Sequence, residues 1–368
     1  MIPLRVLHAV SSPDCDEAQA LRPVIDLLAT QGHESAWLCP GSHPERATDG
    51  RTIICYTTGR WRWWRSEQAA VTRRVAAWTP DLLQVDGLSQ LSPAIDIGRR
   101  LGLSLVTTQH HTDEPYAARR LRDPLVAWVL VPSEHHRAEA VGRLGVARDR
   151  IAILPTGVVV VPTNEPVDDP GHWTVGVIAD RDVAALKRWL IALAEVQNAG
   201  LPVRCAVLAR TPELQAKVED FARGASAAIT SRSGSSVVEF IASLDVVCLP
   251  STREAPAMYA LTAMANGKPL LAMTTAGLPE LVRDGQTAIL VEPINRDGLA
   301  DGLRQLHERS LRLSMGRAAR SMAAERYAAP LVAEATLAVY RAALGDLTAG
   351  AKAEVTTAWR RMTESRIR

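Results

Sequence analysis

One acidic residue, Glu254, stands where a carboxylate could contact a ligand. It follows an apolar run that ends at Leu249 and predicts a buried strand, and it precedes a small-residue helix expected over 257–266. Ligands of open α/β sheets bind outside the carboxyl ends of the strands, and a helix N-terminus can bind phosphate through its free N–H groups. The sequence therefore predicts a ligand site at this loop. The alternative interpretation is that Glu254 only complements the helix dipole.

Short apolar runs alternate with helical patterns, which is typical of parallel, doubly wound α/β sheets. The strands expected in the first half are 4–10, 35–39, 52–56, 82–85, 103–108, 128–131 and 151–154. Those expected in the second half are 174–179, 204–209, 227–230, 246–249, 270–273 and 288–291. The expected helices include 17–31, 182–198, 213–222, 235–243, 279–283, 296–307 and a final long helix over 313–343.

The chain length predicts two domains, since 368 residues are too many for one ordinary core, and a segment rich in proline and acid predicts where they are joined. The expected divisions are a first domain over 1–161, a linker rich in proline and acid over 162–172, a second domain over 173–345 and a helical tail over 346–368. Whether the helix over 313–343 returns to the first domain stays open.

The amino-acid composition limits the classes of protein to which this chain could belong. The apolar content of 47% and charged content of 22% are those of a soluble globular protein, and the net charge of +2 gives no argument for a nucleic-acid partner. No signal peptide is visible, and no apolar run approaches the roughly 20 residues that span a bilayer. The five cysteines form no C-x-x-C pair. We therefore expect free thiols in a reducing cytoplasm.

The segment over 249–280 resembles the donor-binding signature of retaining GT-B glycosyltransferases of the family 4 type. The shared pattern is P-S-x-x-E, A-M-A-x-G-x-P and G-L-P-E, and the matching residues are Pro250, Ser251, Glu254, Ala263, Met264, Ala265, Gly267, Pro269, Gly277, Leu278, Pro279 and Glu280. The resemblance extends over about 1–345. It implies a GT-B architecture, with an acceptor-side and a donor-side Rossmann-like domain facing each other across a cleft.

The resemblance also implies an activity of the hexosyltransferase type, in which a sugar passes from a nucleotide-diphosphate donor to an acceptor with retention of configuration. Glu254 would accept hydrogen bonds from hydroxyls of the donor sugar. His110, in a T-x-H pattern after a strand, would face the same sugar, although a structural histidine is the alternative interpretation. The backbone after Glu254 would cover the diphosphate; it comprises Ala255, Pro256, Ala257 and Met258.

Several positions depart from the family pattern. Thr262 stands where a second glutamate would hold the ribose, and a neutral hydrogen bond is weaker than a charge-assisted one. Arg181 and Lys187 are the counterparts of the family's phosphate-binding arginine and lysine, but they are six residues apart instead of five and lack the flanking glycines. Solvent-facing helix charges are the alternative interpretation of this pair.

The loop after the first strand, over 11–17, contains no glycine, although the family uses a glycine pair there to bring backbone amides close to the donor phosphate. Its two aspartates, Asp14 and Asp16, would repel phosphate. Two D-x-D triplets occur, Asp14–Asp16 and Asp180–Asp182, but GT-B enzymes generally need no metal. We therefore expect no metal and no cofactor apart from the nucleotide-sugar substrate.

A patch of alternating arginine and tryptophan over 60–65 contains Trp61, Trp63 and Trp64. This combination suits a membrane interface or a lipid-linked acceptor. The alternative is that the tryptophans pack inward while the arginines remain solvated. The acceptor class therefore stays open among a saccharide, a lipid-linked molecule and a small molecule.

The motif departures support an alternative function from another class, namely a GT-B protein that binds a partner or ligand without catalysis. A sugar-nucleotide epimerase fits the motifs less well. Binding of nucleotide sugars discriminates between the transferase and a non-catalytic protein.

Overall fold

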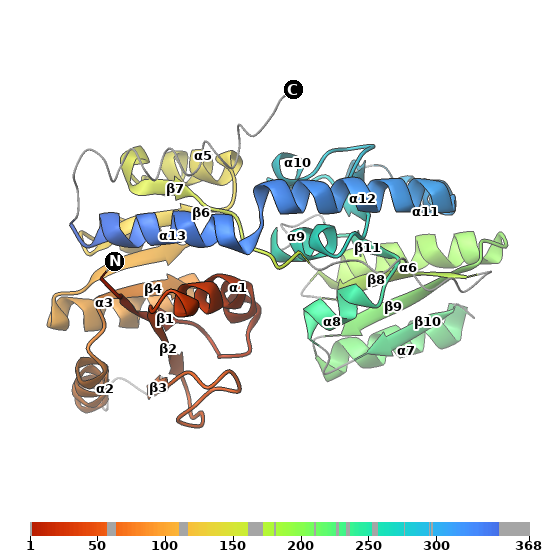
Figure 1. Ribbon diagram of the computed structural model, residues 1–368. Coiled ribbons are helices and arrows are strands. Elements are labelled where there is room, and N and C mark those ends of the chain that lie inside the picture. Colours follow the sequence, from red (N-terminus) through yellow and green to blue (C-terminus); the bar gives the residue numbers. More distant parts are fainter. Residues whose placement is uncertain are drawn as a thin grey trace. The chain divides into compact units, whose positions relative to one another are not determined.

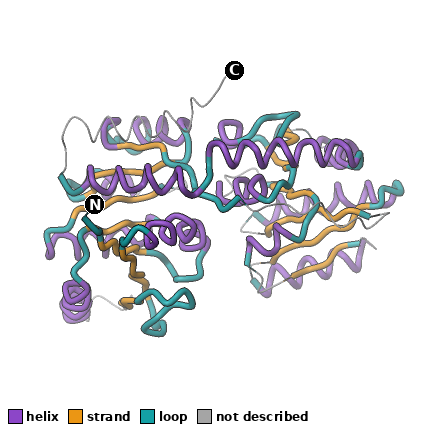
Figure 2. Tube along the Cα trace, in the orientation of Figure 1, coloured by secondary structure: helices purple, strands orange, loops and turns teal. Residues whose placement is uncertain are grey.

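The computed structural model describes residues 2–56, 64–109, 117–160, 172–179, 182–209, 211–225, 228–232, 236–251, 257–275, 277–293, 295 and 297–345. Residue contacts divide the chain into two compact units. The first unit comprises Met1–Gly157 together with Arg326–Arg368, and the second comprises Val158–Glu325. Each unit is an α/β layer structure built on one parallel sheet (Figures 1 and 2).

The first unit contains a seven-stranded parallel sheet with the order β3-β2-β1-β4-β5-β6-β7. Its strands are β1 (Arg5–Ala9), β2 (Glu34–Pro40), β3 (Ile53–Tyr56), β4 (Leu82–Asp86), β5 (Ser104–Thr108), β6 (Val126–Val131) and β7 (Ile151–Ile153). The strand order reverses between β1 and β4, which are hydrogen-bonded neighbours. In doubly wound folds such a reversal marks the place where ligands bind.

Helices cover both faces of this sheet. One face packs against α1 (Asp16–Thr30) and α13 (Ala329–Ala343), and the other packs against α2 (Trp64–Trp78), α3 (Leu91–Leu101) and α5 (Glu134–Gly142). A short helix, α4 (Ala117–Leu121), lies before β6. The α3 helix ends at Gly102, whose φ of 70° is the left-handed conformation expected of a glycine at a helix C-terminus.

The final helix of the described chain differs from the sequence prediction in two ways. The long helix expected over 313–343 is two helices, α12 (Arg309–Arg326) and α13, and Pro330 lies in the first turn of the second, where its missing N–H is tolerated. The chain from Arg326 onwards belongs to the first unit, although the sequence placed 173–345 in one domain. The cause is burial of the α13 apolar face against α1 and the strands β5 and β6.

The second unit contains a six-stranded parallel sheet with the order β10-β9-β8-β11-β12-β13. Its strands are β8 (Trp173–Ala179), β9 (Val203–Ala209), β10 (Ile229–Arg232), β11 (Val246–Leu249), β12 (Leu270–Met273) and β13 (Ala288–Val291). The order reverses between β8 and β11. Its helices are α6 (Val183–Asn198), α7 (Pro212–Ala225), α8 (Val237–Ala242), α9 (Ala257–Ala265), α10 (Leu278–Leu281), α11 (Gly298–Leu306) and α12.

Each strand expected from the sequence is present among the described residues, and the largest displacement is that of β10, which lies two residues beyond the expected 227–230. The prediction of doubly wound, Rossmann-like sheets is therefore confirmed. No described helix has both the length and the apolar character that crossing a bilayer requires.

Candidate functional site

The loops after β8 and β11 lie at the strand reversal of the second sheet and are joined by a hydrogen bond. Ser251, two residues after β11, donates its hydroxyl to a carboxylate oxygen of Asp182 at 3.1 Å. The other oxygen of Asp182 accepts the backbone N–H of Ala185 at 2.9 Å and caps the N-terminus of α6. Asp182 is therefore a structural residue of this loop, and the motif serine holds the two loops together.

The loops after β8 and β11 contain several of the residues predicted to bind the donor. Glu254, Ala255 and Pro256 come between Ser251 and the start of α9, and Arg181 directly precedes Asp182, but these four lie outside the described residues. His110 also lies outside them. The predictions for these side chains therefore remain predictions, while the backbone on either side places their loops at the carboxyl ends of β8, β11 and β5.

The remaining predicted donor-binding residues are on two helices. Thr262 and Met258 are buried on α9, with 8% and 5% of their surface exposed, and Ala257 at the start of that helix is partly buried. Lys187 is exposed on the second turn of α6. The α9 helix is buried and contacts both β11 and β12, and this close packing explains why the signature has small residues there.

The backbone conformations at two positions of the signature explain why glycine occurs there. Gly267 after α9 and Gly277 before α10 have φ values of 65° and 78°, in the left-handed region that other residues rarely adopt. The carbonyl of Gly267 also approaches α12 so closely that a Cβ atom at position 316 would lie 2.2 Å from its oxygen. These glycines therefore shape the ends of α9 and α10.

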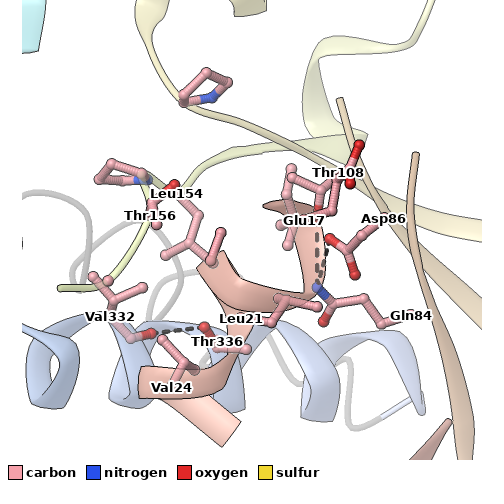
Figure 3. Close-up of a pocket in the computed structure, with 15 residues that line it drawn as sticks. Glu17, Leu21, Val24, Gln84, Asp86, Thr108, Leu154, Thr156, Val332 and Thr336 are labelled. Atoms are coloured by element: carbon pink, nitrogen blue, oxygen red, sulfur yellow. Dashed lines mark hydrogen bonds between the residues drawn. The ribbon is translucent and has the colours of Figure 1, made fainter. Parts of the chain in front are cut away.

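A pocket with a volume of about 50 Å³ lies at the carboxyl end of the first sheet, between α1, α13 and the strand ends (Figure 3). Its polar lining consists of Glu17, Gln84, Asp86, Thr108, Thr156 and Thr336. Asp86 is the last residue of β4 and Thr108 the last residue of β5, two positions before His110. Sequence reasoning missed Asp86, although the rule that selected His110, a polar residue at a strand's carboxyl end, applies equally to it.

The carboxyl group of Asp86 is almost completely enclosed, with 1% of the residue exposed. Burial is the main cause that raises its pKa to about 7, and hydrogen bonds from Thr108 and Gln84 partly oppose this effect. The Gln84 amide donates to Asp86 Oδ1 at 3.1 Å, whereas Asp86 Oδ2 has no hydrogen-bond partner among the described residues. A carboxyl group that changes protonation near neutral pH is typical of functional sites.

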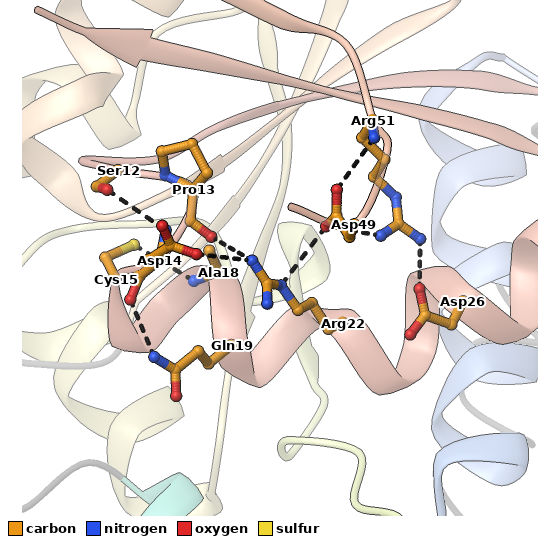
Figure 4. A network of polar contacts seen from close by, with 10 residues as sticks. All are labelled: Ser12, Pro13, Asp14, Cys15, Ala18, Gln19, Arg22, Asp26, Asp49 and Arg51. Atoms are coloured by element: carbon orange, nitrogen blue, oxygen red, sulfur yellow. Dashed lines mark hydrogen bonds and ion pairs between the residues drawn. The ribbon is translucent and has the colours of Figure 1, made fainter. Parts of the chain in front are cut away.

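The loop after β1 is held by a network of ion pairs (Figure 4). Arg22 pairs with Asp14 at 3.1 Å and with Asp49 at 3.5 Å, and Arg51 pairs with Asp49 at 2.9 Å and with Asp26. Burial works against ionisation of Asp49, but hydrogen bonds from Arg51 and the charges of both arginines together lower its pKa. Asp14, whose negative charge the sequence suggested would repel phosphate, is thus paired with Arg22.

Within the described ranges, no three His, Cys, Asp or Glu side chains are grouped so that they could hold a metal ion. The expectation of a metal-independent protein stays a prediction. All five cysteines are free thiols: Cys39, Cys205 and Cys248 are buried, and Cys15 and Cys55 are partly buried.

The two halves of the chain each match a protein family. Residues 22–160, which contain β2 to β7, match the model described as Glycosyltransferase Family 4. Residues 170–309, which contain β8 to β13, match the model described as Glycosyl transferases group 1.

A curated relative is also named as a glycosyltransferase. The chain is 43% identical over 111 residues to a D-inositol 3-phosphate glycosyltransferase of Mycobacterium leprae (strain Br4923), a stretch that is 28% of this chain and 25% of the relative. The match thus spans about a quarter of that relative's length.

Solved structures share the fold. The structure of Anabaena Alr3699/HepE in complex with UDP and glucose has a TM-score of 0.76 and 15% identity, over 92% of this chain and 99% of that one. A glycosyltransferase from Rickettsia africae ESF-5 has a TM-score of 0.74 and 14% identity, over 93% and 99% of the two chains. With a family model matched in each half and a common fold over nearly the whole length, the chain belongs to the GT-B glycosyltransferases of group 1.

Proposed function

We propose that the protein transfers a sugar from a nucleotide-diphosphate donor to the hydroxyl group of an acceptor, with retention of configuration at the anomeric carbon. The observation that carries this proposal is the position of the P-S-x-x-E loop. It leaves β11 at the strand reversal of the second sheet, next to β8, and leads into the N-terminus of α9. That is where an open α/β sheet can hold a diphosphate.

In the proposed reaction, the bond between the anomeric carbon and the diphosphate oxygen breaks, a bond to the acceptor oxygen forms, and the acceptor hydroxyl passes its proton to the departing diphosphate. Arg181, Lys187 and the start of α9 would stabilise the departing diphosphate. Glu254 would orient the donor sugar through its hydroxyls, with His110 close to the reacting carbon. The chain would mainly position the two substrates and stabilise developing charge, which requires no covalent intermediate.

Calorimetric titration with UDP-, GDP- and ADP-sugars and the free nucleotides tests this proposal. We expect at least one donor to bind with a Kd in the micromolar to millimolar range that is usual for KM values of enzyme substrates. Failure of every donor and every free nucleotide to bind would contradict it. D-inositol 3-phosphate, for which the Mycobacterium relative is named, belongs in the acceptor panel of the accompanying transfer assay.

The alternative of a GT-B protein that binds without catalysis is favoured by one particular observation, the buried Thr262 in place of an acidic residue on α9. A single neutral hydrogen bond to the ribose would weaken nucleotide binding by roughly tenfold relative to a carboxylate. Nucleotide binding without turnover on any acceptor would support this alternative.

Peripheral membrane contact through the tryptophan patch is a further part of the proposal. Trp61 and Trp63 lie outside the described residues, and Trp64 begins α2. We expect the wild-type protein to float with liposomes containing anionic lipid, because arginines are attracted to the surface charge and indoles insert at the interface. The Trp63→Ala/Trp64→Ala variant should remain in the unbound fraction. Equal flotation of the two proteins would remove membrane contact from the proposal.

A further inference from the structure

We infer that the pocket of the first unit is an acceptor subsite that receives an uncharged hydroxyl group of a sugar or polyol and excludes phosphate, and that Asp86 determines this choice. The inference rests on the transferase function proposed above. It assigns to that function a class of acceptor, which neither the family models nor the relatives specify for this chain.

A chain of hydrogen bonds determines which atom of Asp86 is available to a ligand. The hydroxyl of Tyr340 on α13 donates to Gln84 Oε1, so the amide nitrogen of Gln84 is directed at Asp86 and donates to Oδ1. Because Oδ1 is an acceptor, the proton of the neutral carboxyl group belongs on Oδ2. That atom is buried without a hydrogen-bond partner among the described residues, which costs free energy until a ligand supplies one.

The shape of the pocket suits a small polar group attached to carbon. Figure 3 shows Asp86 and Gln84 extending from the strand towards α1, with Leu21 and Leu154 as apolar neighbours. A volume of about 50 Å³ provides room for roughly three or four water-sized groups. The pocket therefore accommodates a hydroxyl or hydroxymethyl arm, which would accept the Oδ2 proton and place its carbon against the leucines, and not a complete sugar ring.

The charges of the lining oppose a phosphate group. Glu17 and Asp86 are both acidic, and the described residues that line the pocket include no lysine, arginine or histidine. A phosphate would lie beside the carboxyl group of Glu17 with no cation in the lining to compensate its negative charge. An ammonium group has no lone pair with which to accept the Oδ2 proton of Asp86. A neutral hydroxyl has neither disadvantage.

Saturation-transfer NMR on the full chain without nucleotide tests the inference with three probes, of which only the first carries a neutral hydroxyl group: myo-inositol, methyl phosphate and methylammonium. We expect myo-inositol to bind at least tenfold more tightly than the other two. Asp86→Asn retains an acceptor and an N–H donor and should bind myo-inositol within threefold of the wild type. Asp86→Leu should weaken binding at least tenfold, whereas the matched control Asp26→Leu, on the exposed side of α1, should leave it unchanged.

A second variant keeps the test decisive if Asp86→Leu does not fold. Ala20→Leu adds side-chain volume at a residue of α1 that lines the pocket, and it should also weaken myo-inositol binding at least tenfold. The inference is overturned if the phosphate or the amine binds as tightly as myo-inositol, if myo-inositol does not bind, or if folded Asp86→Leu and Ala20→Leu both retain it. The nucleotide titration is independent, so donor binding without polyol binding would reject the subsite and retain the transferase.

Discussion

Replacing Glu254 with alanine should lower the turnover number for sugar transfer by at least about 100-fold, the loss typical of removing one preorganised contact to a transition state. A carboxylate that accepts hydrogen bonds from sugar hydroxyls makes charge-assisted bonds, and these are stronger than neutral ones. If the same contacts form in the bound substrate, the change will also raise the KM for the donor. Initial rates with saturating acceptor and varied donor separate the two effects.

Control measurements distinguish a lost contact from a lost fold. The Glu254→Ala protein should unfold at the wild-type temperature in a circular dichroism melt, because Ser251 and α9 hold the ends of the loop independently of the carboxylate. Glu195→Ala makes the same change at an exposed position of α6 and should keep wild-type kinetics. Unchanged turnover in Glu254→Ala would show that the assignment of this residue is incorrect.

Replacing Gly316 with alanine should destabilise the second unit by about 2–3 kcal/mol, since overpacking of a rigid contact costs about 1–3 kcal/mol and occasionally more. The new Cβ would lie 2.2 Å from the Gly267 carbonyl oxygen and 3.2 Å from its carbon, and both are backbone atoms of a turn in the left-handed conformation. Alanine is normally the better helix residue by roughly 0.5–1 kcal/mol. The close contact must therefore reverse the usual sign of this substitution.

The matched control for Gly316→Ala is Gly224→Ala near the end of α7, where a Cβ would meet nothing within 4 Å. This variant should be as stable as the wild type or slightly more stable. For a unit of this size, a loss of 2–3 kcal/mol lowers the melting temperature by roughly 4–12 °C, which a thermal melt resolves easily. Equal melting temperatures for the two variants would mean that α12 does not approach Gly267 as described.

Much of the fold was predictable because the sequence patterns that specify its helices and strands lie in short stretches of the chain. Buried parallel strands such as Val246–Leu249 are continuous apolar runs, and helices such as α3 end at a glycine that alone adopts the required backbone angles easily. Both signals are contained in fewer than about fifteen neighbouring residues. The spacing of the P-S-x-x-E and G-L-P-E segments was sufficient to indicate the family in the same way.

Contacts between distant parts of the chain were not predictable from these signals. The alanine-rich pattern of α13 specifies a helix with a buried face, but it does not specify which sheet buries it. The hydrogen bond from Tyr340 to Gln84 joins residues that are 256 positions apart, and it orients the amide that leaves Asp86 Oδ2 without a partner. Likewise, Asp182 was one member of a D-x-D triplet in the sequence and became a helix cap bonded to Ser251 in the structure.

The amino-acid sequence by itself thus determined the alternating elements, the family and the loop that carries Glu254, since each depends on residues close together along the chain. Only the tertiary structure determined that α13 belongs to the first sheet and that Asp86 lines a pocket there, because burial and hydrogen bonding of these groups depend on neighbours that the chain supplies from far away.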